Sequence, residues 1–264
     1  MTSSRLNGIP RSNSRPVPAA GNALLHFVRH LKTHTLWNKK VFGPNPNTNP
    51  QLAAAINAAK RASMPKDRIE GAIARGQGKS SDGAALESIT FEAIMPPSIA
   101  LIVDVETESK LRALQELNLM VKKAKGSAGS SKFFFSRLGR VVFEKRESGL
   151  DVDQIMDEAI EAGAEDLEND VDGNIVVWTQ PTGTTQVCKA VGDRFGLKIL
   201  SSDIIWTANE DTKAKLDASD EQISFTELLE ALNEHPEIQA VYSNVAKGEM
   251  SDDVWARIQD NLDT

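Results

Sequence analysis

Hydrophobic residues recur at two spacings along this chain, a helical spacing before residue 80 and a strand spacing after residue 88. In the first part, residues three or four positions apart form apolar stripes, one from Leu24 to Leu31 and another carried by Leu52, Ala55, Ile56, Ala59, Ile69 and Ile73. Pro65 stands where a second helix would begin. Residues 50–76 therefore predict a helical hairpin.

From residue 88 the pattern becomes that of strands alternating with helices. Segment 88–107 predicts two strands around the Pro96-Pro97 turn, and a helix follows at 109–124. Segment 132–147 is predicted to form a hairpin, and helix, strand, strand, helix and strand follow up to residue 208. The order β-α-β-β-α-β is typical of a ferredoxin-like sandwich.

The order of these elements predicts an α+β protein, with an N-terminal helical domain followed by two small α/β (ferredoxin-like) domains, one inserted in the other. The reason is that 88–124 supplies only β-β-α, and a helix and strand at 223–245 supply the missing half. The expected parts are 1–22, disordered or a mitochondrial presequence; 23–80, basic and helical; 81–131 plus 209–245, split α/β; 132–208, inserted; and 246–264, an acidic tail that docks or stays loose.

Charge is distributed unevenly along the chain. The net charge is −7 over 264 residues, yet residues 1–80 hold 13 Lys/Arg and 2 Asp/Glu, while residues 81–264 hold 17 and 35. Opposite signs on one chain favour a part that binds a polyanion, joined to a part that avoids it. The alternative is that the acidic residues only keep the C-terminal part in solution.

Two basic stretches, 60–79 and 122–146, supply the candidate contacts to nucleic acid or ribosome. The hairpin needs only its apolar stripe, so its basic side chains are expected to project outward. The candidates are Lys60, Arg61, Lys66, Arg68, Arg75, Lys79, Lys122, Lys123, Lys125, Arg137 and Arg140. A rival role for the hairpin cations is to balance the acidic domains.

The sequence contains no convincing catalytic or metal motif. The stretch 76–81, GQGKSS, fails as a phosphate loop because Ile73 stands where the first glycine is required. His26, His30 and His34 share a helical face, but no neighbouring cysteine or carboxylate completes a metal shell. Cys188 is expected to be a buried thiol, and the phenylalanines at 133–135 are expected in the core rather than stacked on bases. We expect no cofactor, no metal and no enzymatic activity.

Four segments resemble the YebC family, also known from the mitochondrial translational activator of cytochrome c oxidase subunit I. They are NPNTNPQLAAAINAAKRASMPKDRIEGAIARGQG at 45–78, ESITFEAIMPPSIALIVDVETES at 87–109, AGAEDLEND at 162–170 and LLEALNEHPEIQAVYSNV at 228–245. The resemblance implies three domains, nucleic-acid or ribosome contact, and no catalytic residues. The family's opening segment has no counterpart in the first 42 residues, and AKGSAGSSKFF at 124–134 lacks a family histidine and glycine.

The first functional hypothesis is a mitochondrial translation factor that binds mRNA or the mitochondrial ribosome. A DNA-binding transcriptional regulator is the alternative, and an enzyme is the third. The Arg- and Ser-rich, acid-free start resembles a matrix-targeting presequence, and a single cysteine suits a reducing compartment or the matrix. The longest apolar runs are too short to span a membrane, and we expect a monomer.

Overall fold

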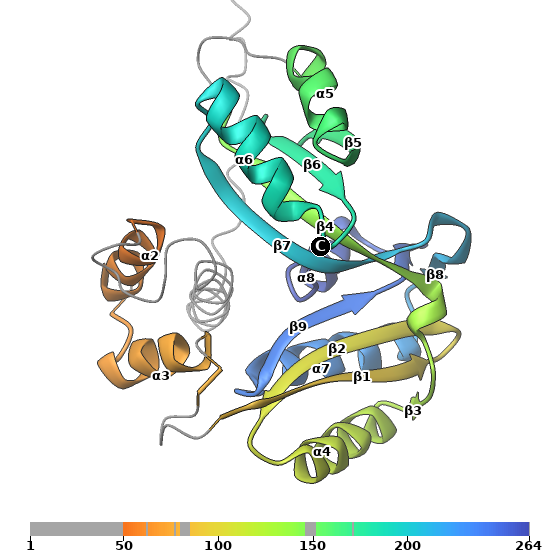
Figure 1. Ribbon diagram of the computed structural model, residues 1–264. Coiled ribbons are helices and arrows are strands. Elements are labelled where there is room, and N and C mark those ends of the chain that lie inside the picture. The colour runs from red at the N-terminus through yellow and green to blue at the C-terminus, as the bar shows by residue number, and fades with distance from the viewer. Residues whose placement is uncertain are drawn as a thin grey trace, which may run out of the picture.

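A computed structural model of the chain describes residues 50–61, 63–76, 78–79, 85–145, 152–170 and 172–263 (Figure 1). These ranges form a mixed structure of helices and mostly antiparallel sheets, which confirms the α+β class. None of the helices within them has the length and apolar character that crossing a membrane requires. The predictions for residues 1–22 and for His26, His30 and His34 lie outside the described residues.

The basic stretch forms the helical hairpin that the apolar stripe predicts. Its helices are α2 (Pro50–Arg61) and α3 (Lys66–Gly76). A small core holds them together, built from Leu52, Ala59, Met64, Ile69 and Ala72, with Ile56 and Ile73 packed against it. Alanines in this core allow the two helix backbones to approach closely, so two short helices suffice.

The first sheet is built from segments far apart in the sequence. In spatial order its strands are β3 (Ser127–Ala128), β1 (Glu87–Met95), β2 (Ile99–Thr107) and β9 (Ile238–Ser243). The helices α4 (Lys110–Lys123) and α7 (Asp220–Glu234) cover one face (Figure 1). Strand β9 pairs with β2, with Val103 opposite Val241, so the chain returns to this sheet after an excursion of more than a hundred residues.

The second sheet is formed within that excursion. Its strands, in spatial order, are β5 (Ala164–Asn169), β6 (Ile175–Thr179), β4 (Phe135–Phe143) and β7 (Ile199–Ala208). All pairings are antiparallel, and the helices α5 (Val152–Glu161) and α6 (Thr184–Phe195) cover one face. This is the sheet and helix order of a ferredoxin-like sandwich.

The hairpin predicted at 132–147 is wrong, because a short 3₁₀ turn (Lys132–Phe134) leads into one continuous strand, β4. Gly139 lies in the middle of β4 and marks a close approach rather than a turn. A Cβ atom at this position would lie 2.2 Å from Cγ2 of Thr184 and 3.0 Å from Cγ2 of Thr179. The glycine therefore lets the start of α6 sit directly on the sheet.

The outer faces of the two sheets meet in a separate apolar cluster. Its buried members are Ala100, Ile102, Phe135, Ile205 and Tyr242, and Trp178 and Trp206 pack against them. Each sheet therefore has helices on one face and the other sheet on the opposite face.

The C-terminal segment docks rather than staying loose. β10 (Val245–Lys247) pairs in parallel with β8 (Ala214–Leu216), which follows a 3₁₀ turn (Glu210–Thr212). Helix α8 (Asp252–Gln259) then buries Ile258 in the core of the first sheet. Asp252, Asp253 and Asp260 lie on its exposed side, whereas Asp263 is half-buried and accepts a hydrogen bond from the backbone N–H of Val241.

Replacing Gly139 by alanine tests the close approach of α6 to β4. The added methyl group must displace a branched threonine side chain, so Gly139→Ala is expected to lower the free energy of unfolding by roughly 1 to 3 kcal/mol. Gly129 is the matched control, because a Cβ atom there meets nothing within 4 Å. Urea unfolding followed by circular dichroism measures both. Equal stability of the two variants would contradict the packing described for Gly139.

Candidate nucleic-acid interface

Four basic residues gather around the turn between α2 and α3. Lys60 and Arg61 end α2, and Lys66 and Arg68 lie in the first turn of α3. All four are exposed. The turn is closed by two backbone hydrogen bonds, from Ser63 N to Lys60 O at 3.0 Å and from Met64 N to Ala59 O at 3.0 Å. The backbone thus places two pairs of cations at one end of the hairpin.

The hairpin cations have few acidic partners within the described residues. Lys66 lies 3.4 Å from Glu70 in an exposed pair one helical turn apart, which contributes little to stability. Lys60 and Arg61 also suit the negative end of the α2 dipole, a structural role that they fill without a nucleic acid. None of the four side chains takes part in the hairpin core.

The other hairpin candidates continue toward the end of α3. Lys79 is exposed, and its backbone forms an isolated bridge with Ala85. Arg75 lies on α3, but its side chain falls outside the described part of the chain. The hairpin turn therefore carries the best-defined basic surface.

The second basic stretch divides between two elements instead of forming one patch. Lys122, Lys123 and Lys125 are exposed at the end of α4, beside the first sheet. Arg137 and Arg140 lie on β4 of the second sheet, where each covers a tryptophan ring. The guanidinium carbon of Arg137 is 5.5 Å from the ring centroid of Trp206, and that of Arg140 is 6.0 Å from the ring centroid of Trp178.

Arg140 is not a freely projecting surface residue, contrary to the expectation from sequence. It is half-buried, faces the layer between the sheets, and lies opposite Asp203 in the register of β4 and β7. Such cation–π contacts are typical of arginine and hold the side chain against the sheet.

The expectation of core phenylalanines at 133–135 is wrong for one of the three. Phe135 is buried, whereas Phe133 is 67% exposed and packs on Phe134 with ring centroids 4.1 Å apart. Glu92 fixes this turn by accepting hydrogen bonds from the backbone N–H groups of Ser131 and Lys132. Burial would raise the pKa of Glu92, but these bonds and the Lys132 ammonium outweigh it and lower the pKa.

Asp203 is the acidic group most affected by the layer between the sheets. Burial raises the pKa of Asp203 to about 6, against the opposing effects of a hydrogen bond with Ser201 and the charge of Arg140. The carboxylate of Asp263 raises it further. The folded protein therefore holds a proton on Asp203 at a pH where the unfolded chain has lost it.

Replacing Asp203 by asparagine tests this assignment. Because the folded pKa is raised, the ionised form destabilises the fold, and stability falls as pH rises from the ordinary value of 3.8 to about 6. Asp203→Asn is thus expected to be more stable than the wild type at pH 7.5, with the difference shrinking below pH 6 and absent near pH 4. Thermal unfolding across this range measures it, and Asp193→Asn on the exposed side of α6 is the control. A pH-independent difference would contradict the assignment.

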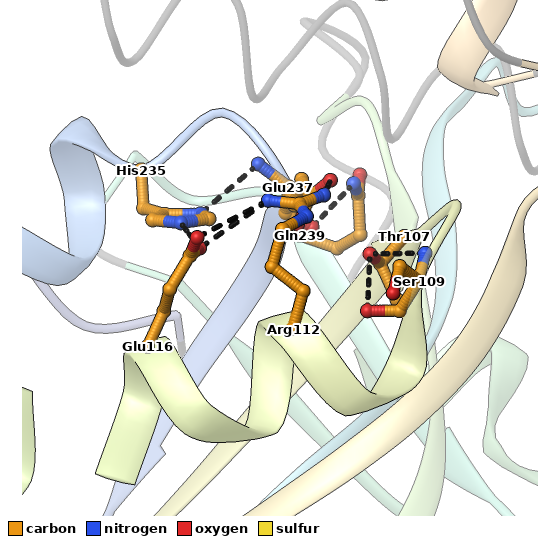
Figure 2. Close-up of polar contacts among 7 residues, drawn as sticks. All are labelled: Thr107, Ser109, Arg112, Glu116, His235, Glu237 and Gln239. Atoms are coloured by element: carbon orange, nitrogen blue, oxygen red, sulfur yellow. Dashed lines mark hydrogen bonds and ion pairs between the residues drawn. The ribbon is translucent and has the colours of Figure 1, made fainter. Parts of the chain in front are cut away.

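A second polar cluster, not expected from the sequence, joins α4 to the turn between α7 and β9. Figure 2 shows Glu116 and Arg112 on α4, pointing toward His235 and Glu237. His235 Nε2 lies 3.2 Å from Glu116 Oε2, and Arg112 Nη2 donates to Glu237 Oε1 at 2.5 Å. The ligand atoms of Glu116, His235 and Glu237 all lie within 4.8 Å of one another, close enough to share a metal ion.

The guanidinium of Arg112 already supplies the positive charge that this cluster needs. Its Nη1 atom lies 3.3 Å from Glu116 Oε2, so one arginine bridges both carboxylates. The hydrogen bond with His235, more than the charge of Arg112, lowers the pKa of Glu116. A metal ion would have to displace Arg112, so the cluster fits a tie between elements better than a metal centre. No sequence signal marks it, because Glu116 and His235 are 119 residues apart.

Removing the arginine tests whether it is the cation of this cluster. Arg112→Leu leaves Glu237, which is only 8% exposed, without its charge partner. We expect the free energy of unfolding at pH 7 to fall by roughly 1 to 3 kcal/mol, and the added change Glu237→Gln to restore most of it. Denaturant unfolding measures both variants. A melting temperature of the wild type that rises with added zinc would contradict this interpretation.

Comparison with known proteins shows similarity along most of the chain. Residues 26–79 match the family described as "TACO1/YebC protein N-terminal domain", and residues 86–245 match "TACO1/YebC second and third domain". The N-terminal match begins at residue 26, so the expectation that the first 42 residues have no counterpart in the family is wrong for residues 26–42. A "probable transcriptional regulatory protein" of Hyphomonas neptunium is 36% identical over 88% of this chain and 89% of its own length. A protein of the same name from Nitrosococcus oceani is 35% identical over 88% of this chain and 90% of its own length.

A solved structure shows the same similarity in three dimensions. It is the crystal structure of a conserved hypothetical protein from Aquifex aeolicus, with a TM-score of 0.56 and 27% sequence identity. The match covers 86% of this chain and 91% of the other.

Proposed function

Because this chain belongs to the TACO1/YebC family, we propose that it is a non-enzymatic regulator of gene expression that binds the phosphate backbone of a nucleic acid. The observation that carries the proposal is the turn of the α2–α3 hairpin, where Lys60, Arg61, Lys66 and Arg68 are all exposed and the core needs none of them. Cations that the fold does not require are available for phosphates.

The physical basis is the release of counterions. Each phosphate that a lysine or arginine neutralises sets free part of the ion atmosphere of the nucleic acid, so binding weakens steeply with salt. Lysine and arginine contacts of this kind position a protein on the backbone without reading sequence. The acidic remainder of the chain repels the same polyanion, which directs the approach to the hairpin.

The name "probable transcriptional regulatory protein" that the relatives carry favours a transcriptional role, and thus DNA as the target. In a DNA-binding helical hairpin, the second helix reads bases through Arg, Asn and Gln side chains. Helix α3 has the sequence KDRIEGAIARG, which holds two arginines but neither Asn nor Gln. If DNA is the target, we expect contact with its backbone and little sequence preference.

A mitochondrial translation factor is the second candidate, with mRNA or the mitochondrial ribosome as partner. The acid-free, Arg- and Ser-rich composition of residues 1–22 favours import into the matrix, and the resemblance to a mitochondrial translational activator favours RNA. Ribosomal RNA presents a dense phosphate surface that basic side chains bind without base reading. This role needs no cofactor and is compatible with a monomer.

Neutralising three hairpin cations tests the proposed function. Lys60, Arg61 and Arg68 are changed together to glutamine, which leaves the Lys66–Glu70 pair in place. The control changes three exposed lysines elsewhere, Lys110, Lys189 and Lys215, and alters the net charge equally. With about 0.7 to 0.9 counterions released per contact, the slope of log affinity against log salt should fall by about 2 to 3, and affinity near 0.1 M salt by roughly 10- to 100-fold.

Binding is measured by fluorescence anisotropy on duplex DNA, duplex RNA and single-stranded RNA, and by co-sedimentation with ribosomes at low and high salt. An unchanged slope in the hairpin variant, or an equal loss in the control variant, would overturn the hairpin interface. A salt-sensitive preference for ribosomes or RNA would favour the translational role, and a preference for duplex DNA the transcriptional one.

A further inference from the structure

The two helices that cover the first sheet expose large apolar side chains to water. Both α4 and α7 bury one side in the core of that sheet. On α4, however, Leu111 is 70% exposed and Leu119 is 55% exposed, and on α7 Ile223 is 53% exposed. Three of the six large apolar side chains that are exposed in the described ranges therefore belong to this layer. Apolar side chains gathered on one surface indicate a contact site, whereas single ones do not.

The charges of the α4–α7 layer are divided by sign between the two helices. Helix α7 contains neither lysine nor arginine, and the one acid of α4, Glu116, is held by Arg112. The exposed charged side chains are thus basic on α4 and acidic on α7, namely Lys110, Lys122 and Lys123 against Asp220, Glu227 and Glu234. None of these takes part in an ion pair with another residue of the described ranges. Their charges remain available to a partner.

The two helices run in opposite directions. Helix α4 follows β2 and α7 precedes β9, and these strands are antiparallel neighbours. Arg112 near the start of α4 accordingly contacts Glu237, which follows the end of α7 (Figure 2). The basic end of α4, with Lys122 and Lys123, therefore lies level with the first turn of α7, which contains Asp220.

A layer of this kind is complementary to itself. A half-turn rotation about an axis that lies in the contact plane, parallel to the helices, places α4 of a second copy over α7 of the first and keeps their ends level. The lysines at the end of α4 then face Asp220 of the other copy. Leu119 comes within about one helical turn of Ile223. Each contact occurs twice, because a two-fold interface uses the same surface on both copies.

We propose that the α4–α7 layer binds a second copy of this chain, with the basic helix of each copy packed on the acidic helix of the other. The helices have 14 and 15 residues, so each is about 21 to 23 Å long. Their contact would bury about 1,000 Å² in total, which is at the low end for specific interfaces and predicts a weak dimer. The inference does not rest on the proposed function. It gives Lys122 and Lys123 a carboxylate partner in place of a phosphate.

Charge reversal on one helix at a time tests the dimer. The first variant carries Lys122→Glu and Lys123→Glu, and the second carries Asp220→Lys and Glu227→Lys. Each variant alone places like charges opposite one another in both halves of the interface, so self-association is expected to weaken by about 10- to 100-fold. An equal mixture of the two restores opposite charges and is expected to dimerise. Leu119→Gln removes apolar contact without changing a charge and is expected to weaken association by about 3- to 10-fold.

Sedimentation velocity of the full chain at increasing concentration, without nucleic acid, measures self-association, and circular dichroism verifies folding. A wild type and a mixture that dimerise, with two separate variants that do not, support the interface. A wild type that stays a monomer at high micromolar concentration, as the sequence alone predicts, overturns it. So does a mixture that stays monomeric, or a control with Lys189→Glu and Lys215→Glu, outside the layer, that weakens association as much as the first variant. The hairpin cations take no part in this experiment, so the dimer and the proposed function fail independently.

Discussion

The burial of β2 on both faces is the constraint on which the rest of the structure depends. Eight of its nine residues are buried, and Asp104 is the exception. Leu101, Val103 and Val105 face the helices α4 and α7, while Ala100 and Ile102 face the second sheet. A strand that is apolar on both faces cannot border water, so the first sheet requires a second layer, and the inserted segment supplies it.

A hollow of about 430 Å³ lies beside this layer. Strands β4 and β7 extend beyond their own helices, so that Phe135 and Trp206 reach the outer face of the first sheet. Bulky aromatic residues at such a junction leave irregular space where the two sheets diverge, and the docked helix α8 closes one side of it with Trp255. The same contacts that join the sheets thus create a preformed aromatic surface, and they bury Asp203 beside it.

Most elements could be predicted from the sequence because their signals are local. The helical spacing from Leu52 to Ile73 and the apolar runs of β1 and β2 identify those elements, and the class is α+β as expected. What the sequence could not supply depends on distant neighbours. A glycine in the sequence suggests a turn, but Gly139 allows α6 to pack closely on β4. Glu116 and His235 are far apart in the sequence, and only the folded structure brings them into contact. The division into domains stays a prediction, since the cluster between the sheets makes each one depend on the other.

Charge separation places the basic side chains of this chain in two different surroundings. The hairpin cations have few acidic neighbours and face water, so their attraction for phosphates acts over about a Debye length and weakens with salt. Arg137 and Arg140 instead lie against tryptophan rings within an acidic body, where net repulsion opposes a rigid duplex. The exposed cations of the hairpin are therefore the ones that a polyanion meets first, because the acidic body repels it elsewhere. Arg137 and Arg140 serve the packing of the second sheet instead, because each lies over a tryptophan ring.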